Sequence, residues 1–235
     1  LRHFKELIKS GCDIIDIGGE STRPGSKEIK SELEWSRIKN VLKRIKSNNN
    51  LISLDSRKVD VMKKASKYKI HLINDISGLS YSKETINFLK ESNLPFVIHH
   101  IQGNPQSMQK KPKYKNIIID IYDYFETKIK LIRSAGIKHN NIILDPGIGF
   151  GKNLKHNMSI LKNISIFHSL GFPILVGASK KRFIGEIDKK YDSKKRHGGT
   201  ISTSIFLAMQ GIQILRIHEA KEVNQALTVF KKLKF

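Results

Sequence analysis

The chain has 235 residues, of which 39% are hydrophobic, and it carries a formal net charge of +22 at pH 7. This length suits one large domain over residues 1–235, and the composition excludes disordered and fibrous proteins. The single cysteine, Cys12, cannot form an intrachain disulfide and favours a reducing, cytoplasmic setting. No apolar run is long enough to cross a bilayer. The lysines are spread over helix-like positions, which favours solvated helix faces over a nucleic-acid-binding arm.

Short β-branched runs alternate with amphipathic stretches along the whole chain. We expect strands over 13–17, 51–54, 72–75, 96–99, 141–144, 174–176 and 214–217. We expect helices over 2–9, 32–47, 58–67, 83–92, 116–135, 156–170, 199–210 and 219–233. Strands that alternate with helices pair in parallel, and these strands are apolar on both faces, so the pattern predicts an α/β fold.

The expected helix over 2–9 has no strand before it, and this bears on the architecture. A doubly wound sheet could also hold seven strands. A leading helix without a strand fits better the second half of a strand–helix unit, which brings the number of units to the eight of a closed barrel. We therefore expect a (β/α)8 TIM-type barrel with seven of its eight strands present and the first strand missing.

Polar residues follow the expected strands at their carboxyl ends, where a parallel barrel builds its active site. They are Asp16, Asp55, Asn74, Asp75, His99, His100, Asp145, Ser179, Lys181, Arg216 and His218. Helix capping could explain Asp55 or Asn74 taken alone, but Lys and Arg are poor caps. Carboxylates and an amide suit a flat heterocycle rich in N–H groups, whereas cationic side chains suit a diphosphate. The strand ends thus predict a ligand with a polar ring and a phosphate group.

Two other motifs carry less weight. The glycine-rich run over 147–153 lacks the spacing of a nucleotide-binding loop, so we interpret it as a mobile loop over the site. His99 and His100 are neighbours on an expected strand and face opposite sides of it, so they cannot bind one metal ion together.

Seven segments, in order, resemble those of the dihydropteroate synthases, the pterin-binding barrel enzymes of folate biosynthesis. They lie over 13–25, 73–76, 100–105 with 108–109, 144–153, 176–185, 199–200 and 215–218. The most specific are Asp-Ile-Ile-Asp-Ile-Gly-Gly-Glu-Ser-Thr-Arg-Pro-Gly over 13–25 and Leu-Asp-Pro-Gly-Ile-Gly-Phe-Gly-Lys-Asn over 144–153. Two alternatives stay open: a pterin-binding methyltransferase barrel of the corrinoid kind, and a basic nucleic-acid-binding protein.

The resemblance implies a transferase with small-molecule substrates. Such an enzyme condenses (7,8-dihydropterin-6-yl)methyl diphosphate with 4-aminobenzoate, giving 7,8-dihydropteroate and diphosphate. Carried over by position, Asp55, Asn74 and Asp145 would hold the pterin ring, with Lys181 beside its carbonyl and ring nitrogen.

The resemblance also assigns the other end of the ligand. Arg216 and His218, with the main chain of Ile217 between them, would hold the diphosphate. Thr22 and Arg23 would lie in a mobile loop near both substrates. The catalytic residues would be Asp55, Lys181 and Arg216.

Phe150 and Arg182 would lie near the aminobenzoate ring. Two positions depart from the family pattern: Lys180 stands where the family usually has Arg, and Ile101 where it usually has Met. Both changes preserve charge or packing, so neither alters the expected activity.

The family's first strand is followed by an Asn that binds Mg²⁺ on the diphosphate, and no metal ligand can be named in this chain. The resemblance therefore implies Mg²⁺ bound through the substrate, and a homodimer, with no nucleic-acid or membrane partner. Without the first strand, we expect the 235-residue chain alone to be poorly active.

Overall fold

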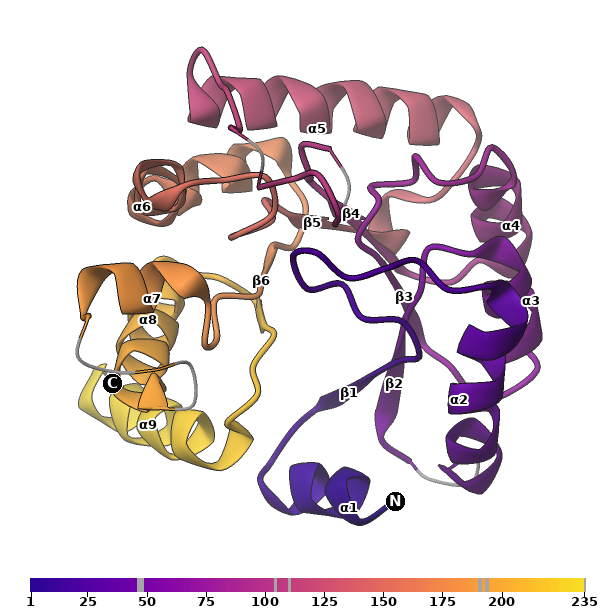
Figure 1. Ribbon diagram of the computed structural model, residues 1–235, viewed down its shortest axis with the longest axis horizontal. Helices are drawn as coiled ribbons and strands as arrows, with labels where there is room; N and C mark the ends of the chain where they lie inside the picture. The colour runs from indigo at the N-terminus through magenta and orange to yellow at the C-terminus, as the bar shows by residue number, and fades with distance from the viewer. Residues whose placement is uncertain (46–48, 104, 110, 190–191, 193–194, 235) are drawn as a thin grey trace.

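In the part of the chain that the structure describes, seven parallel strands lie at the centre of the fold and helices surround them (Figure 1). The computed structural model describes residues 1–45, 49–103, 105–109, 111–189, 192 and 195–234. One parallel sheet contains, in chain order, β1 (Ile14–Gly18), β2 (Leu51–Asp55), β3 (Leu72–Asp75), β4 (Phe96–His99) and β5 (Ile142–Asp145). A second contains β6 (Leu175–Val176) and β7 (Ile214–Leu215).

The two sheets form one parallel arc. A parallel bridge joins Leu144 of β5 to Ile174, and the N–H of Leu144 donates to the carbonyl of Pro173 at 2.9 Å. The expected seven strands are therefore confirmed, in the order and direction of a (β/α) barrel. Within the described residues, no strand pairing joins β7 to β1.

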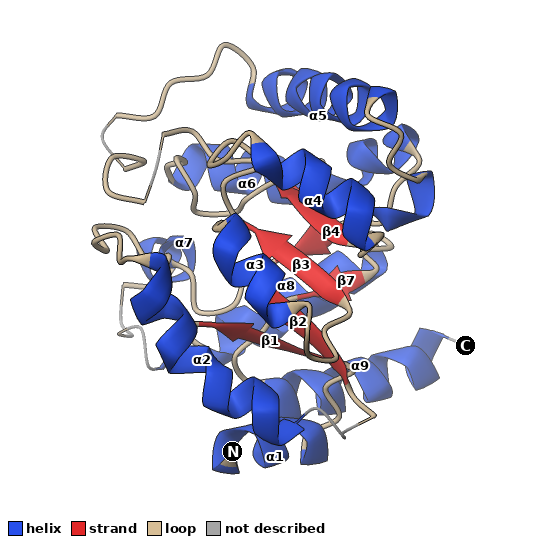
Figure 2. Cartoon of the chain, turned by 90° about the vertical axis from the view of Figure 1, so that its right-hand side faces the viewer, coloured by secondary structure: helices blue, strands red, loops and turns tan. Residues whose placement is uncertain are grey.

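Helices form an outer ring in which chain order runs around the barrel (Figures 1 and 2). They are α1 (Arg2–Lys9), α2 (Ser31–Ile45), α3 (Val59–Ala65), α4 (Glu84–Ser92), α5 (Ile117–Ser134), α6 (Leu154–Lys162), α7 (Arg182–Ile187), α8 (His197–Met209) and α9 (Ala220–Lys234). Residues 46 and 47 of the expected helix over 32–47 lie outside the described residues. None of the described helices has the length and apolar character that a membrane span requires.

The expected helix over 156–170 is divided in two. It begins earlier, at Leu154, because Asn153 caps it: the Asn153 side chain accepts from the His156 N–H, and the His156 side chain accepts from the Asn153 N–H. It ends at Asn163, whose side chain donates to the Ser159 carbonyl at 2.8 Å. A 3₁₀ segment, Ile164–Leu170, follows. Asn favours such local bonds over helix continuation.

The short helix α7 was not expected from the sequence. It has six residues and buries Phe183 and Ile184. Its one and a half turns are too few to show helical periodicity in the sequence. Its position matters for the site because α7 begins directly after Lys181.

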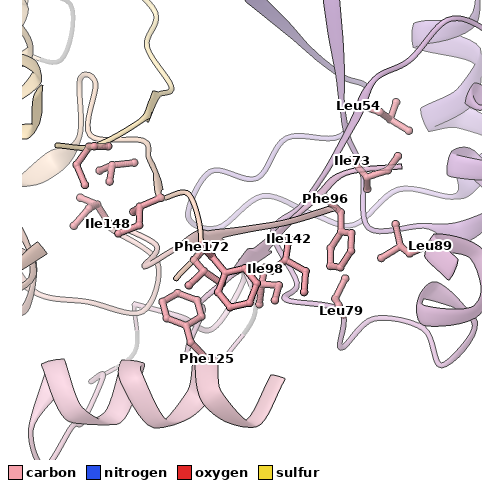
Figure 3. Packing of buried hydrophobic residues seen from close by; sticks show 14 of the residues in the cluster. Leu54, Ile73, Leu79, Leu89, Phe96, Ile98, Phe125, Ile142, Ile148 and Phe172 are labelled. Atoms are coloured by element: carbon pink, nitrogen blue, oxygen red, sulfur yellow. The ribbon is translucent and has the colours of Figure 1, made fainter. Parts of the chain in front are cut away.

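The outer face of the strands packs against the helices. Figure 3 shows strand residues Ile73, Phe96 and Ile98 between Leu89 of α4 and Phe125 of α5, and all five belong to one buried cluster. Burying an apolar side chain of this size contributes about 1.5–3 kcal/mol. Packing against the helices explains why the strands are apolar on their outer face.

The inner face carries two layers of side chains. The inner apolar layer consists of Leu72, Val97 and Leu175, with Ile143 and Ile214 packed against them. Side chains on one face of a strand are two residues apart, so the next inward positions lie towards the carboxyl ends. These positions form the inner polar layer, Asp16, Asp55, Asn74, His99, Asp145, Gly177 and Arg216.

Candidate active site

The inner polar layer opens into a hollow at the carboxyl ends of the strands. Its lining residues are Thr22, Asp55, Asn74, Ile76, His99, Asp145, Ile148, Phe150, Gly177, Ser179, Lys181, Arg216 and His218. Side chains as far apart in the chain as Thr22 and His218 thus meet in one place, because parallel strands end on the same side of the barrel.

Three of the expected site residues do not line this hollow. Arg23 is exposed on the loop after β1. The Arg182 side chain is 75% exposed and pairs with Glu186 at 2.6 Å along α7. Ile217 is half-buried between Arg216 and His218 and was expected to act through its main chain. All the other expected residues lie in the lining.

Arg216 is placed by two carboxylates. Its Nε lies 2.7 Å from Asp16 Oδ2, and its Nη2 lies 3.3 Å from Asp55 Oδ2. The Asn74 amide donates to the same Asp16 oxygen at 3.3 Å. Burial, and then the negative charge of Asp16, raise the pKa of Asp55 to about 8, while Arg216 opposes the shift.

Asp145 stands across the hollow in a different setting. Its Oδ1 accepts from the Gly147 N–H at 2.7 Å, and its Oδ2 lies 3.7 Å from His99 Nε2. Burial raises the pKa of Asp145 to about 6, although the bond from Gly147 and the Lys181 charge oppose the shift. Burial also holds the pKa of His99 well below its ordinary value, so His99 is neutral near pH 7.

Lys181 lies over an aromatic ring. Its Nζ is 4.3 Å from the centre of the Phe150 ring, within the range of a cation–π contact. The Phe150 ring meets His99 edge to face, with the ring centres 4.4 Å apart. Burial lowers the pKa of Lys181 to about 8, against the attraction of Asp145. The lysine therefore stays mostly charged near pH 7 but can lose its proton easily.

The loop over 147–153, which we expected to be mobile, is joined to the strand ends by hydrogen bonds. Buried Lys152 lies 2.8 Å from His100 Nδ1, and it donates to the Phe150 carbonyl at 3.0 Å. Gly147 has a φ of 70°, and a Cβ there would lie 2.0 Å from the His100 carbonyl oxygen, so only glycine fits. These contacts set the position of Phe150.

His218 is held at the mouth of the hollow by Ser179. Ser179 Oγ accepts from the His218 N–H at 3.2 Å and lies 3.1 Å from His218 Nδ1. Burial, and then the charges of Arg216 and two lysines, lower the pKa of His218. A neutral imidazole at this place can donate one hydrogen bond to an anion.

Five lining residues were assigned no specific role from the sequence, although His99 and Ser179 were noted as polar strand ends. They are Ile76, His99, Ile148, Gly177 and Ser179. Asp16 was noted as a polar strand end but was not assigned a role, although it bonds both Arg216 and Asn74. The two-residue step from the apolar to the polar layer could have assigned His99 and Asp16 to the inner face of the site.

The donor set of the site does not form a metal cage. No three His, Cys, Asp or Glu side chains of the described chain are grouped so that they could hold a metal ion. The cations Lys181 and Arg216 line the same hollow as Asp145, and both oppose the rise in its pKa. The residues present suit an anion at one side and a hydrogen-bonding ring at the other.

The chain resembles known proteins over most of its length. Residues 1–218 match the family model described as pterin binding enzyme. The dihydropteroate synthase of Escherichia coli is 39% identical over 230 residues, which cover 97% of this chain and 81% of that protein.

Solved structures show the same likeness. A dihydropteroate synthase of Yersinia pestis, in complex with a sulfonamide drug, gives a TM-score of 0.95 at 35% identity and covers 99% of this chain and 84% of its own. That of Thermus thermophilus, in complex with 4-aminobenzoate, gives 0.89 at 31% identity and covers 99% and 89%.

Proposed function

This chain belongs to the pterin-binding enzymes and, within them, to the dihydropteroate synthases, and from this premise we propose how its site works. The protein is a transferase of folate biosynthesis. It condenses (7,8-dihydropterin-6-yl)methyl diphosphate with 4-aminobenzoate to 7,8-dihydropteroate and diphosphate. The observation that carries the mechanism is the hollow in which buried Asp55, Asn74 and Asp145 meet the cations Lys181 and Arg216.

We propose that the ring of the pterin binds among Asp55, Asn74 and Asp145. All three are at least nine-tenths buried, so their oxygens have little water to bond. Asn74 Oδ1 is buried without a partner within the described structure. Such an atom favours a ligand N–H, because an unpaired buried acceptor is costly. Lys181, beside Asp145 and Phe150, would face the ring carbonyl and nitrogen.

The diphosphate would bind between the guanidinium of Arg216 and the imidazole of His218. The main chain of Ile217 lies between these two residues and would add an N–H donor. Thr22 lines the same hollow and would donate its hydroxyl. Arg23, on the exposed loop beside it, would meet the diphosphate from the solvent side.

4-Aminobenzoate would lie against Phe150, whose ring is fixed by His99 and Lys181. Its amine would then point towards the methylene carbon of the pterin. Arg182 would act, as the resemblance implies, only from outside the hollow, since its side chain is largely exposed.

The reaction needs no covalent bond to the protein. The bond between the methylene carbon and a diphosphate oxygen breaks, and its electron pair leaves with diphosphate. The amine nitrogen forms the new bond to carbon and loses a proton. Arg216 and Lys181 stabilise the departing charge, and deprotonated Asp55 stabilises positive charge on the methylene. That positive charge itself favours loss of the Asp55 proton.

We also propose that any Mg²⁺ binds through the diphosphate of the substrate. The described residues supply no group of ligands for it, so its coordination would depend on substrate oxygens. The steps above use only side chains of this chain.

We further propose a homodimer in the cytoplasm, with residues 1–235 acting as one domain. One cluster of buried side chains extends from Phe4 to Ile212, which supports a single domain. Ile187 at the end of α7 and Phe206 and Met209 on α8 are 59%, 38% and 59% exposed, which supports an apolar subunit contact there.

The experiment is a product analysis with both substrates. We expect diphosphate and dihydropteroate in equal amounts, and no diphosphate when 4-aminobenzoate is left out. Release of diphosphate without the amine, or transfer of a methyl group to a corrinoid, would contradict the proposal. Sulfonamides resemble the amine substrate in shape and offer a competing probe.

A further inference from the structure

The loop between β1 and α2, residues 19–30, carries Thr22 into the hollow but has no regular secondary structure. In Figure 1 it reaches across the centre of the ring. A loop of this kind needs an anchor if Thr22 is to keep its place. The anchor begins with Glu20, two residues before Thr22. Its Oε1 accepts from the Ile29 N–H at 2.9 Å, which closes the base of the loop.

The other oxygen of Glu20 meets a buried lysine. Glu20 Oε2 lies 2.9 Å from Lys58 Nζ and 3.2 Å from Arg57 Nε. Burial alone would raise the pKa of Glu20, but the Ile29 N–H and the two cations lower it below its ordinary value. Glu20 is therefore a carboxylate over the working range of pH.

Lys58 joins three parts of the fold. It stands just before α3, its side chain is 3% exposed, and its Nζ also lies 2.8 Å from Oε2 of Glu34 on α2. Glu34 is fully buried. A buried ammonium between two carboxylates holds a narrow geometry, because water cannot replace either partner.

The far end of the loop is held by neighbouring groups. Glu28 accepts from the Tyr81 hydroxyl at 2.6 Å and pairs with Arg57 at 3.5 Å. The Arg57 guanidinium lies 4.7 Å from the centre of the Tyr81 ring. Between these anchored ends, Thr22 lines the hollow, and the Gly25 N–H donates to the Pro105 carbonyl at 2.9 Å.

We propose that Lys58 is a positioning residue for the transfer reaction, acting through Glu20 to hold the loop that presents Thr22 and Arg23 to the substrates. The inference rests on the proposed function. Lys58 does not line the hollow, so it acts only through the loop. Its partner on the helix side, Glu34, serves the fold instead and provides the matched comparison.

The test compares Lys58→Met, Glu20→Gln and Glu34→Gln. For the first two we expect kcat/KM to fall on the order of ten- to a hundredfold, while affinity for a pterin without diphosphate stays within about twofold. Trypsin should also cleave both variants faster after Lys27 or Lys30. Glu34→Gln should lower the thermal midpoint, and its loss of kcat/KM should be smaller than in the other two variants, because the pair of Glu20 with Lys58 remains.

Two results would overturn the inference: unchanged kcat and KM in Glu20→Gln, or an equal loss of all kinetic parameters and of stability in the three variants. If Lys58→Met does not fold, Glu20→Gln decides. The trypsin measurement requires no turnover. It therefore tests the loop anchor separately from the proposed function, even if the unmodified protein releases no diphosphate.

Discussion

Arg216 Nε lies 2.7 Å from Asp16 Oδ2, and this ion pair connects β7 to β1, the two strands that no backbone pairing joins in the described structure. The Arg216 side chain is 39% exposed and that of Asp16 is 18% exposed, so water screens the pair only in part. One guanidinium edge is occupied by the protein, and the rest of the group is directed to the hollow. The pair therefore sets the direction from which an anion is bound.

Asp16→Asn should reduce the pH dependence that Asp55 imparts to stability. The Asp55 pKa is raised to about 8, so between its unfolded value and pH 8 the native state binds more protons than the unfolded state. The contribution of Asp55 to the free energy of unfolding thus falls as pH rises through this window. Removing the Asp16 charge should make that fall smaller, although burial keeps part of it. Urea unfolding from pH 5 to pH 8 measures the difference.

The control for that experiment is Asp60→Asn, at an exposed position on α3. It removes the same charge without contact to Asp55. Equal slopes of stability against pH in the Asp16 and Asp60 variants would show that Asp16 does not act on Asp55.

Binding of a pterin should weaken as pH falls below about 6. The Asp145 pKa is raised to about 6 in the free protein, and the carboxylate is the form that accepts ring N–H groups. Below this pH a proton must leave before the ligand binds, so affinity should drop up to about tenfold for each further pH unit. Calorimetry at several pH values measures it. Asp145→Asn should bind weakly at all pH values, and retention of the wild-type profile in that variant would contradict the assignment.

Lys181→Met should lower kcat/KM by on the order of 10²–10³-fold, the usual cost of removing one preorganised charge from a reacting centre. The side chain keeps most of its length and its contact with the Phe150 ring. Lys189→Met, on the exposed segment after α7, removes the same charge outside the site. Steady-state diphosphate release compares them, and similar rates for both variants would remove Lys181 from the mechanism.

Lys152→Met should change how stability depends on alkaline pH. Burial lowers the Lys152 pKa to about 7, so between pH 7 and its unfolded value the unfolded state binds more protons. The contribution of Lys152 to the free energy of unfolding of the wild type therefore rises with pH across that window. The variant should lack this rise. At pH 9 the variant should be less stable by about 1–3 kcal/mol, because carbonyl and imidazole acceptors lose their donor. Denaturant unfolding at pH 7 and pH 9 tests both points, and parallel curves would contradict them.

Met209→Glu should shift the protein towards a monomer. Met209 is 59% exposed at the end of α8, close in sequence to exposed Phe206, and a carboxylate there would be buried in the proposed dimer. Sedimentation velocity over a range of concentrations measures the state. A wild type that is monomeric at high concentration, or a variant that still dimerises fully, would contradict the proposed contact.

The strands and the convergence of the site could be predicted because both depend on local pattern. Apolar runs end in a polar residue such as Asp55 or Asp145, and parallel strands bring these ends together. Helix boundaries were less certain where a local side-chain bond decides them, as Asn163 does after α6.

The supporting contacts could not be predicted, because they depend on residues distant in sequence. Lys58 and Lys152 look like surface residues in a chain with 43 Lys and Arg. Each is buried only because the fold brings a partner to it: Glu34 for Lys58, and the His100 imidazole for Lys152. Nothing in the local sequence distinguishes them from exposed lysines.

The inner apolar layer has an electrostatic consequence. Leu72, Val97 and Leu175 form a hydrocarbon floor directly beneath the charged side chains. Such a floor polarises weakly, so the field of Lys181 and Arg216 spreads mainly outward through the mouth of the barrel. The anionic diphosphate ester in solution would feel that field before any contact forms, and its capture rate would decline as added salt screens the attraction.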